Sequence, residues 1–119
     1  MTVSKKELGI WGENKAVQYL ISKGYKIISR NFRSKHGELD IIAEKDDCYH
    51  FVEVKTRSSH VFSYPEDSVT KKKQAFIYAA AEAFLDTQSK NVMTWQFDVI
   101  AIERNKLGEA QIEVFENAF

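Results

Sequence analysis

The chain has 119 residues, of which 44% are hydrophobic, and its 17 Lys and Arg side chains balance 17 Asp and Glu side chains. This length and composition predict a single globular domain over residues 1–119, and no apolar run is long enough to enter a membrane. The N-terminus carries no apolar signal segment and Cys48 has no second cysteine, so we expect a cytoplasmic protein. A zero net charge, taken at face value, argues against nucleic-acid binding.

A helix is predicted near the N-terminus. Ser4 is followed by Glu7 in a capping-box pattern, so we expect a helix from about residue 5 to residue 23 that ends at Gly24. Three strands follow it, and they are expected at residues 25–32, 37–44 and 48–57.

The second half of the chain is predicted to contain a helix and two strands. A polar loop at residues 58–63 and Pro65 precede a helix expected from about residue 66 to residue 88. The apolar segment 95–103 is typical of a buried central strand, and residues 110–115 predict a more exposed one. A helix between the first three predicted strands and the buried strand predicts an α/β fold, in which a mixed β-sheet is flanked by helices.

The hairpin over residues 37–57 carries the most informative charges. With a two-residue loop at 46–47, Asp40 faces Glu53 on the same side of the sheet. Two carboxylates this close repel each other unless a positive charge lies between them, and a divalent cation with oxygen ligands supplies that charge. Lys55 projects to the same side as Glu53 and could offset the carboxylates or orient a water molecule.

Structural alternatives remain open for these charges. An ion pair of Lys55 with Asp40 or Glu53 would give the same pattern, and a one-residue slip would separate the two carboxylates. Glu13 lies on the apolar stripe of the first helix, where it could reach toward the sheet or turn its head to solvent. The three histidines lack a shared zinc-site spacing, so no zinc site is expected.

The neutral total charge is an average over blocks of opposite sign. Residues 1–36 carry eight basic and two acidic side chains, residues 37–55 two basic and six acidic, and residues 56–75 four basic and two acidic. An acidic segment between basic ones suits a metal-dependent site that acts on a polyanion, although ordinary solvated surfaces would give the same counts.

Five stretches together resemble the YraN-like family of small bacterial proteins, which is similar to a minimal PD-(D/E)xK nuclease related to archaeal Holliday-junction resolvases. The matching stretches are GENKAVQYL (12–20), RNFRSKHGELDIIA (30–43), FVEVKTR (51–57), VTKKKQ (69–74) and FDVIAI (97–102). The resemblance covers nearly the whole chain in the right order. It implies a restriction-endonuclease-like αβββαβ core.

By this resemblance, the catalytic residues are Glu13, Asp40, Glu53 and Lys55. Asp40 is the motif aspartate, preceded by Leu39 where many members have proline, and Glu53 and Lys55 form the (D/E)xK pair. Asp40 and Glu53 would hold Mg²⁺ or Mn²⁺, and Glu13 would assist from the first helix. Candidates for contacts with phosphate are Arg30, Arg33, Lys35, Arg57, Lys71, Lys72 and Lys73.

The resemblance therefore implies a metal-dependent endonuclease that hydrolyses phosphodiester bonds in DNA, with branched or damaged DNA among the expected substrates. The alternative is a non-catalytic nucleic-acid-binding module that retains the nuclease fold, and a scaffold without a nucleic-acid partner is a third possibility. An enzyme that cuts a four-way junction would pair two sites by twofold symmetry, so a homodimer is among the expected states.

Overall fold

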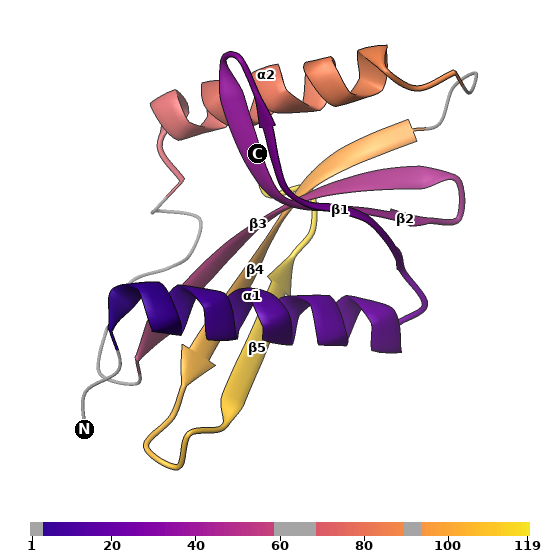
Figure 1. The fold of residues 1–119 in the computed structure, drawn as a ribbon. Helices are drawn as coiled ribbons and strands as arrows, with labels where there is room; N and C mark the ends of the chain where they lie inside the picture. The colour runs from indigo at the N-terminus through magenta and orange to yellow at the C-terminus, as the bar shows by residue number, and fades with distance from the viewer. Residues whose placement is uncertain (1–3, 59–68, 90–93) are drawn as a thin grey trace.

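The computed structural model describes residues 4–58, 69–89 and 94–119, which form two helices and one five-stranded sheet (Figure 1). The elements are, in chain order, α1 (Lys5–Ser22), β1 (Lys26–Ser34), β2 (Gly37–Lys45), β3 (Cys48–Ser58), α2 (Lys71–Asp86), β4 (Thr94–Arg104) and β5 (Ala110–Phe115). This order agrees with the order predicted from the sequence.

The strands are arranged in the sheet in the order β1-β2-β3-β4-β5. β3 and β4 are parallel, whereas the other neighbouring strands are antiparallel. A parallel pair requires a long crossover, and α2 lies in the connection between these two strands. The prediction of a mixed sheet flanked by helices is confirmed, and the arrangement is compatible with an αβββαβ core.

Each helix covers one face of the twisted sheet (Figure 1). Neighbouring residues of a strand point to opposite faces, so β2 contributes Ile42 to the core under α2 and Ile41 to the core under α1. The core under α2 also contains Phe51 and Phe84, and the core under α1 contains Leu20. The sheet therefore lies between two hydrophobic cores, one under each helix.

The first helix and the hairpin turn form as the sequence predicts. The Glu7 backbone N–H donates a hydrogen bond to Ser4 Oγ at 3.1 Å, which caps α1. Asp46 and Asp47 both have positive φ angles, 52° and 60°, as a two-residue hairpin loop requires. This tight turn fixes the register between β2 and β3.

The second helix begins later than predicted, at Lys71 instead of residue 66. Thr70 has an extended backbone and its Oγ1 accepts a hydrogen bond from the Lys73 N–H at 3.1 Å, so the cap residue sets the boundary. Ser58, expected in a loop, pairs with Arg104 at the end of β3. The rest of the predicted loop and Pro65 lie outside the described residues. No helix in the described ranges has the length and apolarity needed to span a membrane.

Candidate active site

The β2–β3 hairpin places Asp40 next to Glu53. Ile41 pairs with Val52, and the same register continued by one residue sets Asp40 opposite Glu53. The Val54 N–H donates a hydrogen bond to Asp40 Oδ2 at 2.8 Å, which anchors the aspartate on β3. The register predicted from the sequence is therefore the one the structure adopts.

Glu53 is buried, with 4% of its surface exposed, and its two carboxylate oxygens differ in their surroundings. Oε1 lies 3.6 Å from Lys55 Nζ and 3.7 Å from Lys73 Nζ. Oε2 has no hydrogen-bond partner, and it is the one buried side-chain oxygen or nitrogen of the described residues in this condition. Buried polar atoms are nearly always hydrogen-bonded, so this oxygen requires either a bound ligand or a proton shared with the Asp40 carboxyl group.

Both carboxyl groups hold protons more tightly than they would in water. Burial raises the pKa of Glu53 to about 7, and the charge of Asp40 and a side-chain hydrogen bond with Asp40 raise it further, against the opposing effect of Lys73 and Lys55. Burial also raises the pKa of Asp40, opposed by the hydrogen bond from the Val54 N–H. Because a second negative charge is unfavourable here, the pair would gain from a cation between its oxygens.

A cleft of about 760 Å³ opens beside this pair. Its lining includes Asp40 and Lys55 from the hairpin, Arg57 farther along β3, and Glu13 from α1. Of the four residues expected to be catalytic, Glu13, Asp40 and Lys55 therefore border one cavity, and Glu53 lies buried next to Asp40.

Glu13 projects from α1 toward the sheet, and residues of β1 hold its carboxylate there. Its Oε1 accepts hydrogen bonds from Arg30 Nε and Asn31 Nδ2, both at 3.1 Å, and Arg30 also donates to Asn14 Oδ1 at 2.8 Å. The Glu13 charge is close enough to raise the pKa of Asp40. Glu13 thus acts on the carboxylate pair through the electric field.

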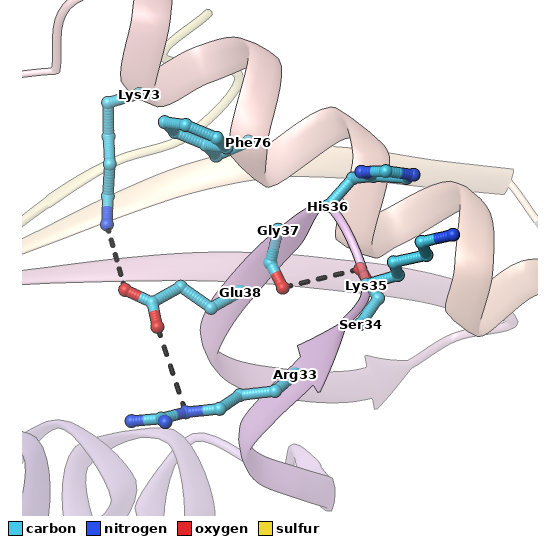
Figure 2. A pocket seen from close by; sticks show the side chains of 8 residues that line it. All are labelled: Arg33, Ser34, Lys35, His36, Gly37, Glu38, Lys73 and Phe76. Carbon is cyan, nitrogen blue, oxygen red and sulfur yellow. Dashed lines mark hydrogen bonds and ion pairs between the residues drawn. The ribbon is translucent and has the colours of Figure 1, made fainter.

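The basic residues predicted to contact phosphate occupy separate places. Arg30 pairs with Glu13, Arg57 lines the cleft, and Lys71 and Lys72 are exposed on the first turn of α2. The remaining three, Arg33, Lys35 and Lys73, line a second cavity at the β1–β2 turn (Figure 2). The contact of Lys73 with Glu53 was missed at the sequence level, because it depends on how α2 packs over β3.

A second group of potential metal ligands in the described residues consists of His50, Asp98 and Glu116, whose ligand atoms lie within 4.8 Å of one another. His50 Nδ1 lies 2.7 Å from Asp98 Oδ2. Asp98 Oδ1 accepts hydrogen bonds from Gln96 Nε2 at 2.9 Å and from the Asn117 N–H at 3.0 Å. Sequence spacing could not reveal this group, because its members come from β3, β4 and the segment after β5.

Comparison with known proteins finds relatives along the whole chain. The sequence profile of the uncharacterised protein family UPF0102 matches residues 12–102. A UPF0102 protein of Syntrophomonas wolfei is 46% identical over 114 residues, covering 96% of this chain and 98% of its own length. UPF0102 proteins of Caldicellulosiruptor saccharolyticus and Clostridioides difficile are 43% and 44% identical, each covering 98% of this chain and 100% of its own length.

Proposed function

This chain belongs to the uncharacterised protein family UPF0102, and we propose that it is a metal-dependent nuclease that hydrolyses phosphodiester bonds in DNA. The observation that carries the proposal is the buried Glu53 beside Asp40, with one carboxylate oxygen left without a hydrogen bond and Lys55 on the same side. The resemblance of these residues to a PD-(D/E)xK motif supports the same conclusion.

The donor set fits Mg²⁺ or Mn²⁺. Asp40 and Glu53 offer only oxygen atoms, and Mg²⁺ usually binds one or two carboxylates and keeps several waters. The orphaned Glu53 Oε2 is a free ligand atom in a place where burial makes an unbalanced charge costly. When bound, such a cation would polarise a phosphoryl oxygen and lower the pKa of a water molecule.

The chain's own residues bind and orient the reactants. Hydrolysis joins a water oxygen to phosphorus, breaks the bond to the leaving sugar oxygen and transfers a proton to it. Lys55, whose side chain is 28% exposed, orients the water or stabilises the charge that develops on phosphate. Lys73 also contacts Glu53 Oε1, and Arg57 attracts the DNA backbone into the cleft.

One observation favours a second candidate, a nucleic-acid-binding module without catalysis. Lys55 and Lys73 neutralise Glu53 Oε1, and Arg30 neutralises Glu13, so much of the negative charge is balanced by the protein itself. A module of this kind would bind DNA in a salt-dependent manner, and binding would survive the loss of Glu53 and Lys55.

The deciding experiment incubates the purified protein with Mg²⁺ or Mn²⁺ and linear, flapped and four-way-junction DNAs. We expect cleavage by the wild type and a rate at least about 100-fold lower for Asp40→Asn and Glu53→Gln, because each removes a direct ligand. The matched control is Glu82→Gln, which changes an exposed carboxylate on α2 and should cut normally. Absence of cleavage of every substrate, or full activity of Asp40→Asn, would contradict the nuclease proposal.

A further inference from the structure

A second cavity, of about 460 Å³, lies where the β1–β2 turn meets the first turns of α2 (Figure 2). Its volume is within the range of sites that bind small ligands. Cationic side chains and the phenyl ring of Phe76 stand out in its lining, which comprises Arg33, Ser34, Lys35, His36, Gly37, Glu38, Lys73 and Phe76. Cationic side chains can contact a phosphate and an aromatic ring can stack on a base, so these groups together suit a nucleotide.

Gly37 fixes the shape of this cavity. A Cβ atom at this position would collide with the backbone carbonyl oxygen of Phe76 and would lie 3.0 Å from the backbone nitrogen of Ala80. Only glycine lets the turn pack directly on the backbone of α2. The turn and the helix therefore hold their side chains in a fixed relation around the cavity.

Glu38 lies where an external anion would be expected. Its Oε1 is 3.6 Å from Lys73 Nζ and its Oε2 is 3.8 Å from Arg33 Nε, so its carboxylate bridges two cations from different elements (Figure 2). The Glu38 side chain is 53% exposed and both contacts are long, which makes the pairs weak. A phosphate could replace this carboxylate at small cost and keep both cations neutralised.

Phe76 supplies a surface for a base. It is 43% exposed, and in Figure 2 its ring lies beside the Lys73 side chain at the cavity. Bases of single-stranded nucleic acid stack on such rings, whereas a base inside a duplex already has its faces covered by its neighbours. An exposed aromatic ring among cations therefore favours an unpaired nucleotide.

Lys73 connects this cavity to the carboxylate pair. Its Nζ lies 3.6 Å from Glu38 Oε1 and 3.7 Å from Glu53 Oε1. A phosphate held by Lys73 would therefore lie close to Glu53, one of the two proposed metal ligands.

We propose that this cavity binds an unpaired nucleotide next to the phosphodiester bond to be cut, with its base on Phe76 and its phosphate between Arg33 and Lys73 in place of Glu38. The inference rests on the proposed nuclease function and specifies its substrate class. That class is DNA with a single-stranded segment at a flap, branch or end.

The test measures binding without divalent cations, by fluorescence anisotropy, for a flapped duplex and a fully paired duplex of equal length. The wild type is expected to prefer the flapped DNA. Phe76→Leu should reduce this preference by about fivefold or more, because base stacking contributes about 1–3 kcal/mol. Glu38→Gln should tighten binding of the flapped DNA severalfold, because it removes the competing carboxylate.

Two controls match these substitutions. Trp95→Leu removes an aromatic side chain that is 51% exposed outside the cavity, and Glu82→Gln removes an exposed carboxylate elsewhere on α2. Both should bind as the wild type does, and urea unfolding of every variant verifies that it is folded. An unchanged flap preference in Phe76→Leu, or weaker binding by Glu38→Gln, would overturn the inference.

The two proposals fail in distinguishable ways. Cleavage with Mg²⁺ together with a flap preference that does not depend on Phe76 would overturn the nucleotide site and leave the nuclease function standing. A Phe76-dependent preference with no cleavage of any DNA would support the nucleotide site and overturn the nuclease function.

Discussion

His50 and Glu53 lie three residues apart on β3 and project to opposite faces of the sheet, where each meets a carboxyl group from a neighbouring strand. His50 meets Asp98 of β4 at 2.7 Å, and both oxygens of Asp98 accept hydrogen bonds or contact the histidine. Glu53 meets Asp40 of β2, a second carboxyl group, and no donor of the described residues reaches its Oε2. Burial of charge is common to both sites, so it is the unsatisfied oxygen that distinguishes the candidate active site.

The hydrogen-bonded pair of His50 and Asp98 has a structural role. The Asn117 N–H donates to Asp98 Oδ1 at 3.0 Å and the Ala118 N–H donates to the Phe97 carbonyl at 2.8 Å. These bonds tie the C-terminal segment to β4. At this site, polar burial serves the fold, whereas at Glu53 it leaves a ligand atom available.

The largest effect on stability is expected from Asp98→Ala. It leaves buried groups of His50 and the Asn117 N–H without their partner, which should lower the free energy of unfolding by about 3–5 kcal/mol. Urea denaturation measures this loss. Glu116→Gln, which changes an exposed carboxylate of the same group, is the control and should cost little. A loss below about 1 kcal/mol in Asp98→Ala would show that the contacts of Asp98 contribute little to the stability of the fold.

In contrast to Asp98→Ala, Glu53→Gln should raise the free energy of unfolding, and the size of this gain should depend on pH. The Glu53 carboxyl has a pKa of about 7 in the folded protein against 4.5 ordinarily, so the wild type loses stability as the pH rises from about 4.5 to about 7. Without divalent cations, Glu53→Gln should therefore be more stable than the wild type at pH 8, by up to about 3 kcal/mol, and similar to it near pH 4.

Urea unfolding across this pH range, with Glu82→Gln as the exposed control, measures the difference. If the free energies of wild type and Glu53→Gln stayed parallel from pH 4 to pH 8, Glu53 would not be a strained carboxyl and the contrast with Asp98 would disappear.

The smallest expected effect is the stabilisation of the fold by bound Mg²⁺, and it tests the position of the cation site directly. At pH 8, Mg²⁺ at about ten times its dissociation constant should raise the free energy of unfolding by about 1.4 kcal/mol. Asp40→Asn should abolish this gain, because Asp40 is a proposed ligand, whereas Glu116→Gln should keep it. If Glu116→Gln abolished the gain and Asp40→Asn kept it, the cation would bind at His50, Asp98 and Glu116 instead.

The sequence by itself was sufficient for the local features of this protein. The Ser4 cap sets the start of α1, and the turn at residues 46–47 sets the hairpin register. Because strand side chains alternate and a two-residue loop allows one pairing, this register brings Asp40 opposite Glu53 without reference to the rest of the fold. The central pair of the candidate site could therefore be predicted.

Tertiary structure decided which groups surround that pair. The contact of Lys73 with Glu53, the pairing of Arg30 with Glu13 and the hydrogen bonds of Asp98 each join segments that are far apart in sequence. Their positions follow from how α1, α2 and the C-terminal segment pack on the sheet, and no residue spacing encodes that packing. Whether a buried carboxylate is satisfied or left with a free oxygen depends on these long-range neighbours, because hydrogen bonding is determined by position in space.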